Sequence, residues 1–250
     1  MVNICLYFQL NPVINLNKLS IFDIGKSNSY FNDDIKKSQN NTKLLKELTN
    51  KVYKQANGMV LRLLEDNLNF KVSYSIPGIL LEQFEKHSPE IINQFKKLLA
   101  TGKVEFLSQT YYSNLSYFYS KKDFVKQIRL NEKKLKDLFN YKPKVFVADL
   151  KLTRDLIKTI ESLGYKAILA ENTAYNQNII YGLKNSKIKI LLKNNKLSTY
   201  IDHNFSDSSW KDWPLSTEKY VDWINKTSAG NQCVNIYLDY EALGMYHQKS

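Results

Sequence analysis

The fold follows from one stretch, Val234-Asn235-Ile236-Tyr237-Leu238-Asp239-Tyr240-Glu241-Ala242-Leu243-Gly244. Its first half is rich in β-branched and aromatic side chains, which is typical of a buried strand. Asp239 and Glu241 follow directly, so the strand delivers two carboxylates to its C-terminal end. In an α/β barrel that end carries the chemistry, because the loops after the strands converge there.

A second segment has the same form, Lys144-Val145-Phe146-Val147-Ala148-Asp149. Acid/base cleavage of a glycosidic bond needs two carboxylates, and two strand ends on one sheet can supply them. The alternative is that each acid only caps the loop or helix that follows its strand.

Strand-like and helical patterns alternate along the whole chain. Strands are predicted at residues 3–10, 70–76, 103–107, 144–148, 166–170, 187–192, 197–201 and 234–238. Helices are predicted at residues 41–67, 79–84, 89–99, 121–139, 154–163 and 218–226. This order predicts an α/β fold of βα units around a parallel sheet. Repeats and Pro-rich linkers are absent from the sequence, so residues 1–250 are interpreted as one domain.

Composition narrows the class of protein. With 250 residues, 43% of them hydrophobic, the chain can bury a sizeable core. An apolar run long enough for a membrane span is missing, and the N-terminus lacks the basic region of a signal peptide. Cys5 and Cys233 are isolated in strand-like runs, which favours a reducing cytoplasm. The three histidines are scattered, so we expect neither a metal site nor a cofactor.

The formal net charge of +12 raises the question of nucleic-acid binding. The lysines, however, are spread over several predicted helices, and only Arg62, Arg129 and Arg154 supply the guanidinium groups that phosphate and base readers use. We therefore expect no nucleic-acid partner.

Six segments in order resemble the α-amylase branch of glycoside hydrolase family 57. They are Cys5–Leu10, Phe22–Lys26, Ser73–Gly78, Thr101–Tyr112, Ser209–Leu215 and Leu238–Glu241. The resemblance covers essentially the whole chain. It implies a distorted (β/α)7-type barrel with parallel strands, a helical segment after it, and a retaining mechanism on α-linked glucans without a metal in the chemical step. Because the chain ends shortly after Asp239, we expect the barrel unit to be incomplete.

The resemblance also implies the catalytic pair. Asp239 falls on the acid/base position of the family. The nucleophile depends on the alignment, since counting forward from Pro143 puts Leu150 on the family's glutamate and counting back from Gly164 puts Asp149 there. We prefer Asp149, because its flanking residues then align as well. Aspartate is one methylene shorter than glutamate, and a displacement of about 1 Å can cost roughly a hundredfold in rate.

Three further positions depart from the family pattern. Asn11 stands where the family has a histidine that binds sugar hydroxyls, Gln109 replaces a glutamate, and Ser113 replaces a second histidine. Together with Asp149, these changes suggest relaxed selection on catalysis. Glu105 is retained and lies near the sugar subsite in the family, although it could equally be a rim acid that pairs with Lys103.

Aromatic side chains on predicted loops indicate the ligand. Tyr111, Tyr112, Trp210, Trp213 and Tyr240 can stack on sugar rings, so the expected ligand is an α-glucan or maltooligosaccharide. Alternatively, the two tryptophans cap the hydrophobic outer layer. We expect Glu105, Gln109, Tyr111 and Trp213 to line one cleft with both catalytic aspartates.

Three functions stay open at this point. The first is an α-amylase-like protein with a degenerate catalytic site and little or no amylolytic activity. The second is a working retaining hydrolase or 4-α-glucanotransferase that uses Asp149 and Asp239. The third is a non-enzymatic interaction protein with a basic surface. A polysaccharide deacetylase would need an Asp-Asp and His-x-x-x-His metal set that the sequence lacks. The oligomeric state is left open.

Overall fold

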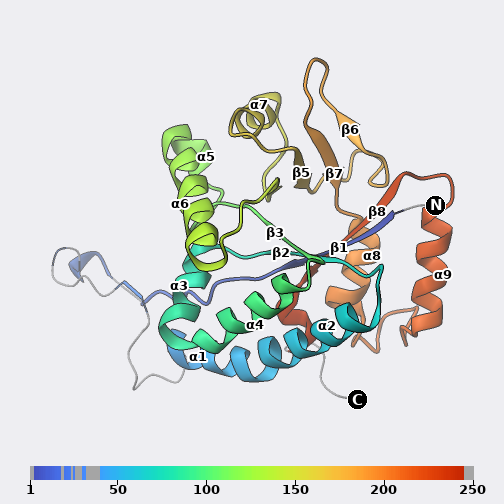
Figure 1. Ribbon diagram of the computed structural model, residues 1–250, viewed down its shortest axis with the longest axis horizontal. Coiled ribbons are helices and arrows are strands. Elements are labelled where there is room, and N and C mark those ends of the chain that lie inside the picture. The colour runs from blue at the N-terminus through green and yellow to red at the C-terminus, as the bar shows by residue number, and fades with distance from the viewer. Residues whose placement is uncertain (1–2, 18–19, 24, 26–29, 32–39, 245–250) are drawn as a thin grey trace.

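Helices and strands alternate through the described part of the chain in the computed structural model (Figure 1). The structure describes residues 3–17, 20–23, 25, 30–31 and 40–244, so Ile24 and Lys26 of the second resembling segment lie outside it. The strands are β1 Asn3–Gln9, β2 Val72–Ser75, β3 Val104–Leu107, β4 Val145–Ala148, β5 Ala167–Ala170, β6 Tyr181–Gly182, β7 Lys189–Leu192 and β8 Cys233–Asp239.

The α-helices cover the outer faces of these strands. They are α1 Asn41–Leu48, α2 Lys54–Asp66, α3 Gly78–His87, α4 Pro89–Ala100, α5 Ser116–Tyr119, α6 Lys121–Phe139, α7 Arg154–Ser162, α8 Asn195–Thr199 and α9 Thr217–Ser228. Shorter helical turns are η1 Ile21–Asp23, η2 Thr49–Tyr53, η3 Tyr200–Asn204 and η4 Tyr240–Leu243. Among the described residues, no helix is long and apolar enough to cross a lipid bilayer.

Two four-stranded sheets, with the orders β3-β2-β1-β8 and β4-β5-β7-β6, make up the barrel. Every pairing within them is parallel except that of the short β6 with β7. Ser108 joins β3 to β4, because its N–H bonds Val145 O at 2.9 Å and its carbonyl accepts Val147 N–H at 2.8 Å. Asn194 N–H bonds Asn235 O at 2.8 Å and joins the end of β7 to β8. The result is the distorted parallel α/β barrel that the family resemblance predicted.

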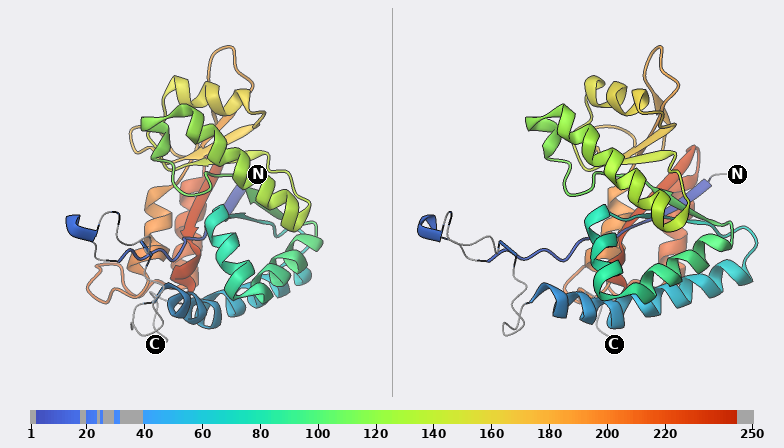
Figure 2. Two further views of the ribbon diagram at one scale, coloured as in Figure 1. Left: turned by 90° about the vertical axis from the view of Figure 1, so that its left-hand side faces the viewer. Right: turned by 60° about the vertical axis from the view of Figure 1, so that its left-hand side comes forward.

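Side chains alternate between the inside and the outside of this barrel, as the pleat of a strand requires. One apolar layer fills the interior with Tyr7, Leu107, Val147, Leu169 and Tyr237, which come from β1, β3, β4, β5 and β8. The outer faces of β1, β2, β3 and β8 pack on α1 to α4, and those of β4, β5 and β7 pack on α6 and α7. Figure 2 shows these two groups of helices on opposite sides of the strands.

One predicted strand is wrong. Residues 197–201 are helical, in α8 and η3, instead of extended. Asn194 caps α8 by accepting Leu197 N–H at 3.0 Å, and Ser198 Oγ bonds back to the Asn194 carbonyl at 2.7 Å. These local bonds satisfy the first turn of a helix and outweigh the strand-like pattern.

Candidate active site

The alternation inside the barrel brings three polar side chains to its C-terminal mouth. Asp149 lies two residues after Val147, Asp239 two residues after Tyr237, and Gln9 two residues after Tyr7. Each therefore faces the same way as an interior residue just below it. Gln9 is also in direct register with Asp239 on the neighbouring strand.

Two side-chain amides connect the aspartates across this mouth. Gln9 Nε2 lies 3.5 Å from Asp149 Oδ2 and 3.5 Å from Asn11 Oδ1. Asn11 Nδ2 in turn lies 3.3 Å from Asp239 Oδ1. The structure thus places both acids at one mouth, while their catalytic roles stay predictions. Asn11, where the family resemblance predicted a histidine, lies between them.

Asp149 opens into a pocket of about 200 Å³, which Gln109, Thr110, Tyr112 and Ser113 also line. The Asp149 side chain is exposed at this pocket, and Asn114 Nδ2 lies 3.5 Å from its Oδ2. Desolvation raises the pKa of Asp149, against a hydrogen bond from Gln9 that lowers it. The carboxyl group that we predict as the nucleophile is therefore harder to ionise than an ordinary aspartate.

Two further acids lie behind Asp239. Asp202 of η3 is buried and accepts the backbone N–H of Asp239 at 3.2 Å. Burial, followed by the charge of Asp239, raises the pKa of Asp202 to about 7. Glu241 is also buried, and its Oε1 accepts Tyr53 OH at 2.7 Å and Asn11 N–H at 2.9 Å. Desolvation raises the pKa of Glu241 as well.

The sequence interpretation missed Glu171, Lys193 and the role of Asp202. Glu171 and Lys193 directly follow β5 and β7, and they line a small cavity with Asp149 and Tyr237. Asp149 was identified because it ends an apolar run, and the same pattern would have identified Glu171 and Lys193. Asp202 lies on a short helical turn, and only the tertiary fold brings it to Asp239.

Of the predicted sugar-binding residues, Gln109 lines the pocket beside Asp149, and its Nε2 is buried without a hydrogen-bond partner among the described residues. Glu105 does not line it. It lies on β3 two residues before Leu107, so the apolar interior layer separates it from the mouth. Burial raises the pKa of Glu105, and Lys144 is the cation that acts on it. The prediction for Glu105 is wrong because the mouth lies at the other end of its strand.

The predicted aromatic residues divide in a similar way. Tyr240 is fully buried on the outer side of β8, where its OH donates to Asn57 Oδ1 at 2.6 Å, so its prediction as a sugar contact is wrong. Tyr111 is buried too, and its neighbour Tyr112 lines the pocket in its place. Trp210 packs on Tyr200 and Trp223, with ring centroids 4.9 and 5.9 Å away. This agrees with the alternative interpretation, in which Trp210 caps the hydrophobic outer layer. Trp213 is 49% exposed and does not line the pocket beside Asp149.

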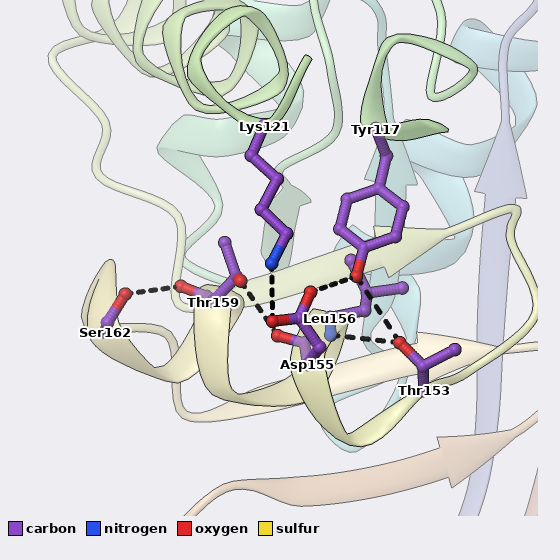
Figure 3. Close-up of polar contacts among 7 residues, drawn as sticks. All are labelled: Tyr117, Lys121, Thr153, Asp155, Leu156, Thr159 and Ser162. Atoms are coloured by element: carbon purple, nitrogen blue, oxygen red, sulfur yellow. Dashed lines mark hydrogen bonds and ion pairs between the residues drawn. The ribbon is translucent and has the colours of Figure 1, made fainter. Parts of the chain in front are cut away.

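A surface cluster fixes the loop that carries Asp149 (Figure 3). Thr153 caps α7 by accepting Leu156 N–H, and Asp155 in the same turn accepts Tyr117 OH and pairs with Lys121, both at 2.5 Å. Tyr117 belongs to α5 and Lys121 to α6. The loops that follow β3 and β4 are therefore tied together beside the pocket.

The chain is a parallel α/β barrel with acidic side chains at the carboxyl ends of its strands. Proteins of this class carry their chemistry at that end of the barrel. Residues 19–250 match the sequence profile of Glycosyl hydrolase family 57, and the chain belongs to this family of carbohydrate enzymes. A protein of Methanocaldococcus jannaschii described as "Putative alpha-amylase" is 36% identical over 219 residues, which are 83% of this chain and 46% of that protein. The chain thus spans about half the length of this curated relative.

Solved structures share the fold at low sequence identity. The 4-alpha-glucanotransferase from Thermococcus litoralis superposes with a TM-score of 0.70 at 14% identity, over 98% of this chain and 34% of that one. A family 57 branching enzyme from Thermococcus kodakaraensis gives 0.66 at 10% identity, over 98% of this chain and 65% of the enzyme. At such identities the likeness concerns the fold alone.

Proposed function

We propose that this chain is an α-amylase-like protein that binds α-glucans at the mouth of its barrel and whose catalysis is weak or lost. The observation that carries the proposal is the state of Asp149. It reaches the mouth, as a nucleophile must, but it has one methylene fewer than glutamate and contacts the amides of Gln9 and Asn114. Desolvation by the protein around it raises its pKa, against the opposing effect of Gln9. A retaining glycosidase needs an ionised nucleophile about 5–5.5 Å from its acid/base partner.

A working retaining enzyme is the second candidate. Its support is that Asp149 and Asp239 share one mouth and are connected through Gln9 and Asn11. In that case Asp239 would protonate the leaving oxygen, and Asp149 would form the glycosyl-enzyme intermediate. The related α-amylase and glucanotransferase would then differ from this chain in rate and not in chemistry.

The test measures release of reducing sugar from maltooligosaccharides together with their binding. We expect binding but little or no release by the native chain. Asp149→Glu should not restore turnover by itself, because Asn11, Gln109 and Ser113 stay unchanged. Turnover by the native chain that Asp239→Asn abolishes would overturn the proposal in favour of the working enzyme. Failure to bind any maltooligosaccharide would reject both.

A further inference from the structure

Tyr112 is a large aromatic side chain that the fold holds in the open. It is 57% exposed at the edge of the pocket beside Asp149. Gln127 of α6 fixes its backbone, because Gln127 Oε1 accepts Tyr112 N–H at 3.1 Å and Ser113 N–H at 3.2 Å. Exposed aromatic rings are common on protein surfaces. Here, however, two successive backbone amides of the loop are held by Gln127, so binding a ligand to the ring needs little further ordering of the loop.

The ring of Tyr112 is braced from behind by Tyr111. Their centroids lie 4.9 Å apart in an edge-to-face arrangement of 66°. Tyr111 itself presses on Gly78 at the start of α3, where an added Cβ would come within 2.1 Å of the Tyr111 ring. Ile79 N–H also bonds Tyr111 O at 3.2 Å. The exposed ring therefore stands on a support that leaves it little freedom to turn inward.

Tyr112 separates two pockets and lines both. The first, beside Asp149, has about 200 Å³, less than the roughly 300 Å³ at which ordinary ligand sites begin. The second, of about 300 Å³, lies between α1, α3 and the segment after β1. Apolar Val13 and Ile79 and polar Thr42, Glu82 and Lys86 line its walls. In Figure 1, α3, α5 and α6 lie on one side of the barrel. The first pocket is lined by the loop that leads into α5, and the second by residues of α3.

We infer that Tyr112 joins the two pockets into one groove for a linear α-glucan chain, with one glucosyl unit stacked on its ring. The chain extends from Asp149, over Tyr112, to the pocket between α1 and α3. This inference rests on the proposed function and names its ligand more narrowly, as a chain of several glucosyl units. A flat ring held in place offers the CH-rich face of a sugar a surface without an ordering cost, and Glu82 and Lys86 offer hydrogen bonds to hydroxyls farther along.

The experiment compares the affinities for maltotriose and maltoheptaose by titration calorimetry. The native chain should bind maltoheptaose about tenfold or more tightly than maltotriose, the gain of one well-formed additional contact. Tyr112→Ala should remove most of that difference, and Tyr112→Phe should retain it, because stacking does not need the hydroxyl. Lys86→Ala should weaken maltoheptaose and leave maltotriose unchanged. The matched control is Tyr119→Ala, since Tyr119 is 89% exposed on α5 and lines neither pocket.

The outcomes separate the two proposals. If the native chain binds no maltooligosaccharide, the proposed function fails. If it binds both lengths equally, or if Tyr112→Ala leaves the length dependence intact, the groove is wrong while glucan binding stands. A loss with Tyr119→Ala as large as that with Tyr112→Ala would also overturn the groove, because general surface aromaticity would then explain the binding.

Discussion

Desolvation changes the pKa values of individual carboxyl groups at the barrel mouth. Asp149, Asp202 and Glu241 all have raised pKa values, and desolvation is the largest cause in each case. Lys193 opposes the shift at Asp149 and at Asp202. Desolvated carboxyl groups hold protons that ordinary ones would release, so Asp149, Asp202 and Glu241 ionise at a higher pH than their residue types indicate.

Asp202 provides a direct test of that statement. Its folded pKa of about 7 lies above the ordinary value of 3.8, so ionisation of Asp202 lowers the free energy of unfolding. This loss develops as pH rises from about 4 to 7 and is complete above 7. Asp202→Asn cannot ionise but can still accept Asp239 N–H. After allowance for solvent screening we expect this variant to gain about 1–2 kcal/mol at pH 8.

The measurement is the melting temperature of both proteins between pH 4 and pH 8. The gain should shrink toward pH 4, where the native Asp202 is protonated too. Asp66→Asn, at the exposed end of α2, is the control and should show no such trend. A difference between Asp202→Asn and the native chain that does not change with pH would rule out titration of Asp202 as its source.

The aspartates at the mouth were predictable, because an apolar run that stops at an acid places that acid at a strand end. Tyr240 was not, although it follows Asp239 directly. Tyr240 is the first residue after β8 and begins η4. It turns outward into the helical layer and packs on Phe8 and Tyr74 with centroids 5.0 and 5.3 Å away. The residue directly after an inward-facing acid at a strand end therefore points away from the barrel interior.

The second prediction concerns Tyr240. Tyr240→Ala removes a fully buried ring and should lower the free energy of unfolding by about 3–5 kcal/mol. Tyr240→Phe loses the bond to Asn57 and the 3.5 Å contact with Tyr74 OH. It should cost about 1–3 kcal/mol while leaving the affinity for maltoheptaose unchanged. Urea unfolding and the same binding titration provide the two measurements. A weaker affinity in a fully folded Tyr240→Phe would return this residue to the binding site.

Helices and loops around the mouth owe their positions to bonds between elements that are distant in sequence. The short helix α5 was not predicted, since four residues carry too little periodicity. Figure 3 shows what holds it: Tyr117 of α5 donates to the Asp155 carboxylate of α7, which also pairs with Lys121 at the start of α6. The pKa of Asp155 is lowered, first by Lys121 and then by Tyr117. Long periodic helices such as α6, by contrast, were predictable from their apolar spacing alone.

Asp155→Ala should loosen this connection. We expect faster amide hydrogen exchange in residues 112–119 and at the start of α7, with little change in β1 or β2. Because its folded pKa is depressed, the stabilisation by Asp155 is present above its ordinary pKa and disappears as pH falls through the folded value, so the variant and the native chain should converge in acid. Asp222→Ala is the control, since Asp222 pairs with Lys226 within α9. Unchanged exchange at residues 112–119 would refute the connection.

The barrel as a whole depends on few bonds where its two sheets meet. The parallel order of the strands could be expected from their alternation with helices, but the seam between β7 and β8 could not. Besides the backbone bond from Asn194 N–H to Asn235 O, the seam rests on the side chain of Asn235. Asn235 is a fully buried polar residue within a mainly apolar strand. Its Nδ2 donates to Leu192 O at 3.0 Å, and its Oδ1 accepts Tyr7 OH at 3.2 Å. A sequence pattern does not reveal which strand such an amide reaches across to.

Asn235→Ala should therefore open that seam. The substitution leaves the Leu192 carbonyl and the Tyr7 hydroxyl without these partners in a place that water does not reach, at about 1–3 kcal/mol for each unsatisfied group. We expect a loss of roughly 3 kcal/mol in urea unfolding, and faster hydrogen exchange that begins in β7 and β8 before it reaches β2. The matched control is Ile236→Val on the next residue of β8, which removes one buried methyl group and should cost about 1 kcal/mol without selective opening. Equal losses in the two variants, with uniform exchange, would mean that ordinary packing closes the barrel and that Asn235 does not.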